Sequence, residues 1–318
     1  MSRKRTLLTI LICLIFLVGL SLLLYPLCSN LWNEHRHQQL ISSYTEELAQ
    51  VPQEDYSKWF DGADAYNETL IGTVPPDAFA FITEEEDANY MAQMAFREDG
   101  VMGYIKIPRI DVNLPIFHTT GEAVLEKGVG HLQGSSLPVG GEGTHCVLSA
   151  HRGLPSAALF TDLNLLEEGD HFYIYVLDRT LAYEVDQILE VEPSQTAALA
   201  IEDGTDYVTL VTCTPYGVNT HRLLVRGHRI PYEEETVAAE EAGPSSSSLH
   251  TRYGLWAGGG IAVTALFILA MYLLTRKPKH GGKHLQKHTG KGAERKGGKR
   301  TEFENTSPSN GPKEPPQP

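Results

Sequence analysis

Cysteine, arginine and histidine side chains stand at the ends of three predicted strands in this chain of 318 residues. In the run DYVTLVTCTPYG, residues 206–217, the alternation of apolar residues ends at Cys213, directly before a Thr-Pro turn. Arg222 follows nine residues later at the start of HRLLVRG, and a hairpin would bring it beside Cys213. His151 ends the run THCVLSAH. Strand ends next to loops present side chains to a substrate, so all three residues are candidates for chemistry.

A thiol beside an imidazole and a guanidinium has the groups that cysteine catalysis requires. Cationic neighbours favour the thiolate. An imidazole can protonate a leaving amine, and a guanidinium can hold a developing oxyanion. Cys13 and Cys28 fall within or at the edge of the first apolar segment, and residue type alone does not choose between Cys146 and Cys213. These two could form one disulfide, or one of them could be a free, reactive thiol.

The residues from 101 onward form short apolar or alternating runs separated by turn signals. The runs are 102–108, 112–118, 144–151, 171–177, 181–191, 206–213 and 221–230. Seven or eight strands with few helices in about 130 residues predict a small closed β-barrel rather than a parallel α/β sheet. Before them, apolar residues recur at steps of three and four over 32–52, which predicts an amphipathic helix.

The sequence around Cys213 resembles a known signature. TLVTC followed nine residues later by Arg is similar to the TLxTC…R motif of the sortases, the membrane-anchored transpeptidases of Gram-positive bacteria. Segments 102–118, 128–170 and 209–229 also look like sortase barrel segments, in the same order. The resemblance covers roughly residues 100–232. It implies a mainly β fold, a closed eight-stranded barrel with short helices.

The resemblance also implies a role for each candidate. Cys213 matches the nucleophile, His151 the acid/base, and Arg222 the oxyanion or substrate-orienting group. Cys146 matches no catalytic position. It lies five residues before His151, so strict alternation puts the two on opposite strand faces, and we expect Cys146 to be a packing residue. The implied reaction is attack of Cys213 on the Thr–Gly bond of an LPxTG-type sorting signal, giving a thioacyl enzyme that an amine resolves. Sortases need no organic cofactor, and the sequence contains no metal-ligand cluster.

Three features resemble the class C sortases, which polymerise pilins. They are a second, C-terminal membrane helix, the sequence AHRGLPSA…LFTDL, which includes His151, and a long segment of about 53–98 before the barrel. In class C this segment carries a lid, typically Asp-Pro-aromatic, whose Asp pairs with the catalytic Arg and whose ring covers the Cys. The resemblance implies LPxTG-bearing pilin subunits and a pilin Lys amine as partners, and an isopeptide-linked pilus as the product.

The matching lid residues of this chain read PPDAF. We expect Asp77 to pair with Arg222 and Phe79 to stack near Cys213. Ala78 stands in place of the lid proline, which frees the backbone φ angle and widens the open ensemble. The alternative is that these residues form a plain surface turn.

Two uncharged apolar runs, 7–28 and about 255–275, are long enough to cross a bilayer. Basic residues precede the first and follow the second, so the positive-inside rule places both termini in the cytoplasm and the intervening part outside the cell membrane. A cleaved signal peptide is the alternative for the first run. The expected organisation is a cytoplasmic N-terminus (1–6), a signal-anchor helix (7–28), an extracellular helical segment with the lid (29–98), the catalytic barrel (99–235), a spacer (236–254), a membrane helix (255–275) and a basic, disordered cytoplasmic tail (276–318).

The distribution of charge argues against one class of function. Residues 7–275 carry 12 Lys and Arg against 36 Asp and Glu, and so acidic a chain is a poor binder of nucleic acid. Three alternatives stay open: a sortase that anchors surface proteins to a peptidoglycan precursor, a wall-anchored surface protein, and a membrane-anchored cysteine peptidase. A wall-anchored surface protein would need its own sorting motif, and the one candidate, LPVGG at 137–141, lacks the Thr of LPxTG. The third usually has its Cys at a helix start, whereas Cys213 ends a predicted strand.

Overall fold

The computed structural model describes residues 3–52, 56–79, 88–246 and 249–275. Contacts divide the chain into a unit that ends at Ala270 and a second unit that begins at Met271. The expected basic tail, 276–318, lies outside the described residues, as do parts of the expected lid-bearing segment and of the spacer (53–55, 80–87 and 247–248).

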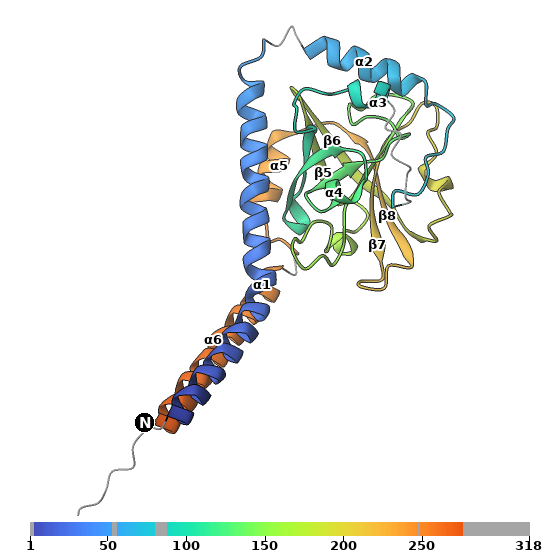
Figure 1. The fold of residues 1–318 in the computed structure, drawn as a ribbon. Coiled ribbons are helices and arrows are strands. Elements are labelled where there is room, and N and C mark those ends of the chain that lie inside the picture. The colour runs from blue at the N-terminus through green and yellow to red at the C-terminus, as the bar shows by residue number, and fades with distance from the viewer. Residues whose placement is uncertain (1–2, 53–55, 80–87, 247–248, 276–318) are drawn as a thin grey trace, which may run out of the picture. The chain divides into compact units, whose positions relative to one another are not determined.

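Within the described residues, eight strands close into a barrel in the order β1-β2-β3-β4-β7-β8-β6-β5 (Figure 1). Their bounds are β1 Val101–Ile107, β2 Val112–His118, β3 Val129–His131, β4 Thr144–Ser149, β5 His171–Val176, β6 Arg179–Val191, β7 Asp206–Thr214 and β8 His221–Ile230. Each of the seven runs expected from the sequence overlaps a strand, with ends that differ by at most two residues or fall within the run. The eighth strand, β3, has three residues, too few for alternation to show. The predicted closed eight-stranded barrel is confirmed.

Two parallel strand pairs interrupt an otherwise antiparallel barrel. β2 pairs with β3, and β4 pairs with β7, each in parallel register. In the second pair Ser149 lies opposite Val211, and the chain between them forms β5 and β6 before it returns. This pairing therefore joins strands that are distant in sequence, and it decides which loops meet at the ends of β4 and β7.

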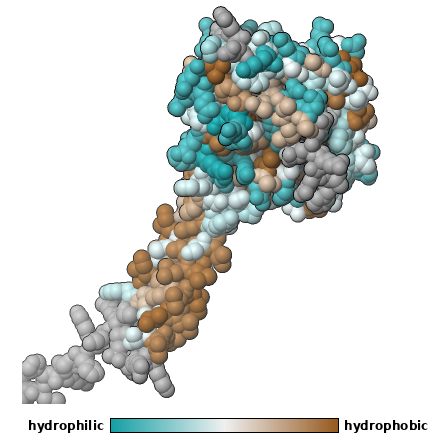
Figure 2. Space-filling model, turned by 45° about the horizontal axis from the view of Figure 1, so that its top comes forward, coloured by the Kyte–Doolittle hydropathy of each residue, from teal (hydrophilic) through white to brown (hydrophobic). Residues whose placement is uncertain are grey.

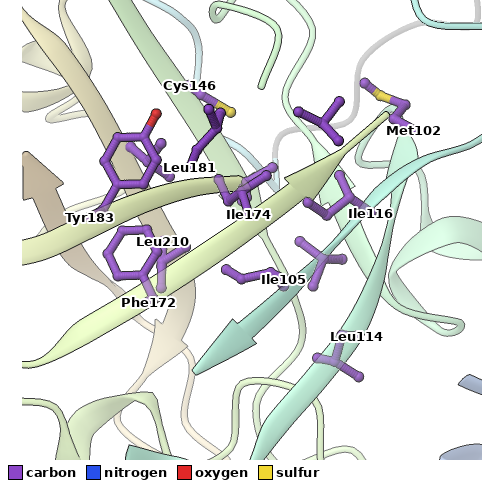
Figure 3. Packing of buried hydrophobic residues seen from close by; sticks show 14 of the residues in the cluster. Met102, Ile105, Leu114, Ile116, Cys146, Phe172, Ile174, Leu181, Tyr183 and Leu210 are labelled. Atoms are coloured by element: carbon purple, nitrogen blue, oxygen red, sulfur yellow. The ribbon is translucent and has the colours of Figure 1, made fainter. Parts of the chain in front are cut away.

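Apolar side chains fill the barrel, and Figure 3 shows several of them, including Ile105, Ile174 and Leu210. Cys146 belongs to this core and is 3% exposed, as expected of a packing residue. Burial raises the pKa of its thiol well above the usual value. Cys146 and Cys213 are both free thiols, so the disulfide alternative is wrong.

A long first helix, α1 (Arg3–Leu48), joins the N-terminal apolar run to the expected amphipathic helix without a break. Its C-terminal part is held against the barrel by Tyr44, which is 1% exposed. The Tyr44 hydroxyl donates to the Met102 carbonyl at 3.0 Å and accepts from the Leu177 N–H at 2.8 Å. Two shorter helices, α2 (Ser57–Glu68) and α3 (Ala88–Ala92), precede the first strand, and α4 (Glu122–Leu125) lies between β2 and β3.

Two helical segments, Thr6–Leu48 of α1 and Gly254–Leu273 of α6 (Leu249–Thr275), are long and apolar enough to cross a membrane by length and composition. Figure 2 shows mainly apolar side chains on the part of the two helices that lies away from the barrel and more polar ones nearer to it. Phe16 and Phe267 stack with ring centroids 3.8 Å apart, so the two helices lie side by side there.

The expected spacer, 236–254, is not free of structure. Its first residues belong to a helix, α5 (Glu234–Glu241), whose Val237 is buried against the barrel. The Glu240 carboxylate accepts a hydrogen bond from the Tyr173 hydroxyl at 2.6 Å. α5 has only eight residues, one of which is buried. So short a helix leaves little periodicity in the sequence, and the polar composition of this segment therefore suggested a linker.

Candidate active site

Cys213 and Arg222 face each other across the β7–β8 hairpin. The two residues are directly paired in the antiparallel register, as the spacing between them predicted. Arg222 Nη1 lies 3.6 Å from Cys213 Sγ, within reach of a hydrogen bond to sulfur. The guanidinium is therefore placed to stabilise negative charge on the thiol or on an oxygen bound beside it.

His151 reaches the same place through the parallel pairing of β4 with β7. Beyond Ser149, the Ala150 N–H donates to the Val211 carbonyl at 3.2 Å. The Thr212 hydroxyl in turn donates to the Ala150 carbonyl at 2.8 Å. Continuing this register by one residue sets His151 alongside Cys213. The structure thus brings the three candidate residues of the sequence to one end of neighbouring strands.

Asp77 forms a two-pronged ion pair with Arg222. Arg222 Nε donates to Asp77 Oδ1 at 2.8 Å, and Nη2 donates to Oδ2 at 2.7 Å. The two side chains are only 15% and 11% exposed, respectively, so the pair is largely shielded from water. Bidentate, charge-assisted bonds of this kind are among the stronger polar contacts in proteins. The guanidinium is consequently engaged by the protein's own carboxylate.

Residues 75–79, which we call the Asp77 segment, cover the site with two further side chains. The Phe79 ring lies 6.0 Å from the His151 ring at an angle of 35°, and the Arg222 Cζ lies 5.0 Å from the Phe79 centroid. The ring therefore covers the two residues that flank Cys213. Ala78 is 1% exposed and belongs to a buried cluster with Val147 of β4, Val211 of β7 and Leu224 of β8. The segment is therefore packed into the barrel end and is not a plain surface turn.

The surroundings of Cys213 keep its thiol protonated. Burial raises the pKa of Cys213, Arg222 lowers it, and Asp77 raises it, with the net shift upward. The thiol is 9% exposed. Because the thiolate is the reactive form of a cysteine, this arrangement disfavours reaction at Cys213.

Two charged side chains near His151 were not singled out from the sequence. Glu122 Oε1 lies 3.4 Å from His151 Nε2, although the pair does not have the angles of a hydrogen bond. The buried Nε2 has no hydrogen-bond partner in the part of the chain that the structure describes. Arg152 Nη1 donates to the Thr214 hydroxyl at 3.2 Å. Glu122 lies in α4, between β2 and β3, and reaches His151 only in the folded chain. No local sequence pattern predicts this contact. Arg152 directly follows His151 in the sequence and could have been considered on that ground.

Among the residues that the structure describes, no three His, Cys, Asp or Glu side chains gather in a way that could hold a metal ion.

Comparison with known proteins identifies the family of this chain. A family model described as the sortase domain matches residues 105–230. The crystal structure of sortase C1 from Streptococcus agalactiae is 47% identical, with a TM-score of 0.57, and the alignment covers 61% of this chain and 100% of that one. The chain belongs to the sortase family.

Other similar structures place this sortase in class C. Sortase C-1 from Streptococcus pneumoniae is 46% identical over 61% of this chain and 100% of its own, with a TM-score of 0.56. By contrast, sortase A of Bacillus anthracis is 28% identical over 145 residues, which is 45% of this chain and 67% of that protein. The sortase is thus a cysteine transpeptidase whose similarity is greater to sortases C than to this sortase A.

Proposed function

We propose that this sortase cleaves an LPxTG-type sorting signal between Thr and Gly and joins the new carboxyl end to a pilin lysine amine, so that pilin subunits become linked into a pilus. The pairing of Cys213 with Arg222 across the hairpin, with His151 alongside, carries the proposal. The pilin part is supported by sortase C of Streptococcus pneumoniae, 45% identical, which is described as having pilin substrate specificity. Cys213, His151 and Arg222 are the proposed catalytic residues.

In the first half-reaction the Cys213 thiolate attacks the Thr carbonyl carbon, and an S–C bond forms. Arg222 holds the negative charge that develops on the carbonyl oxygen. The C–N bond to Gly then breaks, and the leaving amine takes a proton from the His151 imidazolium. The products are a thioacyl enzyme and a free Gly amine, with neutral His151.

In the second half-reaction a lysine ε-amine attacks the thioester carbonyl. The new C–N bond forms, the attacking nitrogen gives a proton to neutral His151, and the C–S bond breaks to release the Cys213 thiolate. The enzyme returns to its starting protonation state, and the product is an isopeptide. Water in place of lysine would give hydrolysis.

The Asp77 segment must move before either step. Asp77 occupies the guanidinium that is to hold the oxyanion, and a single Arg222 fork cannot serve both carboxylate and substrate. The cavity lined by Asp77, Ala78 and Arg222 has a volume of about 10 Å³. That is room for about one water molecule and none for a peptide. We therefore propose that the segment acts as a lid, with Asp77 and Phe79 as its closing residues.

The two apolar helices support a location in the cell membrane. The stretches rich in Arg and Lys lie before the first helix and after the second, which favours a cytoplasmic position for both termini. The barrel between the two helices would then face the outside, where sorting signals are presented. Reagents that label lysines only from outside the cell would test this topology.

The test uses the full-length sortase in detergent with an LPxTG peptide and a pilin domain that bears the acceptor lysine. Mass spectrometry should detect a thioacyl adduct on Cys213 and then a lysine-linked product. Both should disappear in Cys213→Ala and persist in Cys28→Ala, which removes an exposed thiol of α1. If the wild type gives no adduct, the same measurement in Asp77→Ala shows whether a closed lid or an inactive site is the cause.

The amine that resolves the adduct distinguishes the alternatives. Transfer only to a peptidoglycan stem-peptide amine would replace the pilin proposal with wall anchoring. Release only to water, with every amine offered, would support a cysteine peptidase. The absence of an adduct even in Asp77→Ala would contradict the proposed role of Cys213.

A further inference from the structure

The residues that follow His151 form a closed loop. The Phe160 N–H donates to the His151 carbonyl at 3.1 Å. Arg152 Nε donates to the Thr161 carbonyl at 3.1 Å. We call residues 151–161 the His151 loop. Because the two ends of this loop are bonded to each other, a contact that holds its far end also holds the backbone of His151.

The Arg152 guanidinium connects this loop to the strand that carries the nucleophile. Nη1 donates to the Thr214 hydroxyl at 3.2 Å, and Nη2 donates to Asn164 Oδ1 at 2.6 Å. Thr214 directly follows Cys213 and is 6% exposed. All three guanidinium nitrogens of Arg152 therefore bond to neutral oxygens, and within the described part of the chain no carboxylate lies within 4.0 Å of them.

Such a connection matters because the imidazole itself has few contacts: Glu122 Oε1 lies 3.4 Å from Nε2, and the Phe79 ring lies 6.0 Å away. The hydrogen bonds between β4 and β7 end at Ala150. The His151 side chain is 20% exposed, and its buried Nε2 has no hydrogen-bond partner among the described residues. The position of the ring therefore depends largely on its backbone, which Ala150 holds on one side and Arg152 on the other.

We propose that Arg152 is a positioning residue, which holds the acid/base His151 at a constant separation from Cys213 by bonding the His151 loop to the end of β7. The proposal rests on the proposed roles of those two residues. Arginine suits the task because its planar fork can reach three acceptors at once, whereas the lysine ammonium is a single point on a flexible stem. A small displacement of a general acid lowers its efficiency steeply.

Substrates with different leaving groups distinguish a displaced His151 from a general loss of activity. An amide substrate needs a proton on its leaving amine, so its acylation depends on the imidazolium. A thioester substrate of the same LPxT sequence leaves as a thiolate, whose conjugate acid has a pKa of about 8.5, and needs no such proton. Loss of Arg152 should slow the first substrate far more than the second.

The variants to compare are Arg152→Gln and Arg152→Lys in the full-length sortase in detergent. In Arg152→Gln we expect kcat/KM for the amide to fall about 10- to 100-fold. The thioester should lose less than about threefold, because Cys213 and Arg222 are untouched. Arg152→Lys should fall between the wild type and Arg152→Gln. Equal losses on both substrates, or no loss on either, would overturn the proposal.

A chemical cross-link provides a readout that does not require turnover. With 1,3-dichloroacetone, the Cys213 thiolate displaces one chloride, and a ring nitrogen of His151 displaces the other and loses its proton. The lid is kept open by Asp77→Ala in every sample. Mass spectrometry should find the bridged share of alkylated protein lowered at least threefold by Arg152→Gln. An unchanged bridged share would contradict the proposal even if the sortase turned over no substrate.

Arg97→Gln is the matched control. Arg97 also makes three or more side-chain bonds, to Asp99 and Glu47, but at the start of β1. Arg97→Gln should leave the ratio of amide to thioester turnover at the wild-type value. In the Asp77→Ala background it should also leave the cross-linked share of alkylated protein unchanged. A similar change in this control would show that the effect of Arg152 is a general loss of stability.

Discussion

Asp77 and Arg222 lie 145 residues apart in the sequence and form a bidentate ion pair at 2.7 and 2.8 Å over the thiol of Cys213. The pair has two consequences for the proposed chemistry. It removes the guanidinium from the place where an oxyanion would form, and its carboxylate adds to the burial that raises the pKa of the Cys213 thiol. We therefore propose that the closed arrangement protects Cys213, so that the reactivity of the sortase depends on how often the pair opens.

Asp77→Ala should expose the nucleophile. Removing two charge-assisted hydrogen bonds should raise the rate of Cys213 labelling by a neutral alkylating reagent about 10- to 100-fold. Labelling is followed by mass spectrometry of the peptide that contains Cys213. The matched control is Asp186→Ala, which breaks another bidentate pair, Asp186 with Arg226, at 3.0 Å. If both variants raised labelling equally, the lid role of Asp77 would be wrong.

The pH dependence of the same reaction should shift in a defined direction. Because the pKa of Cys213 is raised in the closed state, chiefly by burial, the labelling rate of the wild type should still be rising above pH 9. Asp77→Ala removes a negative charge and uncovers the thiol, and both changes lower the pKa. The midpoint of the rate against pH should therefore move to lower pH in the variant, and a midpoint that stayed in place would contradict the account of the Cys213 environment.

The backbone of the Asp77 segment offers a graded test at Ala78. Proline narrows and glycine widens the set of conformations open to the chain, with effects of about 0.4–1 kcal/mol each. Ala78→Pro should therefore slow Cys213 labelling about two- to fivefold. Ala78→Gly should accelerate it by a similar factor and also loses a methyl group that is 1% exposed. If the labelling rates fell in the reverse order, with Pro fastest and Gly slowest, the closed segment would be shown not to accept the backbone conformation of proline at position 78.

Arg222→Lys should separate protection from catalysis. Lysine keeps the charge but cannot form the two parallel bonds to Asp77, so labelling of Cys213 should increase. The same variant should lose about 100-fold or more in kcat for transpeptidation, because an oxyanion donor is displaced. Both quantities are measured on one preparation. Loss of turnover together with slower labelling would mean that Arg222 holds the site open and not closed.

The strands and the hairpin were predictable from local pattern. Alternation along 206–213 and 221–230 determines which residues share a face, and a short loop between the two strands leaves few possible registers. Cys213 and Arg222 are paired for this local reason. The resemblance to sortases then distinguished Cys213 from Cys146, which alternation from His151 had already assigned to the other strand face.

What the sequence alone determined is thus the set of strands, the apolar helices and the chemical groups at the strand ends. The hairpin predicted the pairing of Cys213 with Arg222, and the resemblance to sortases implied that of Asp77 with Arg222. Only the tertiary structure showed how segments distant in sequence come together to make the other contacts. The parallel pairing of β4 with β7 sets His151 beside Cys213, and the return of the chain brings Asp77 onto Arg222 and Arg152 onto Thr214. Periodicity carries information about the face of a strand but none about which distant strand it will meet. That choice is made by packing of the whole barrel, where all the long-range contacts form together.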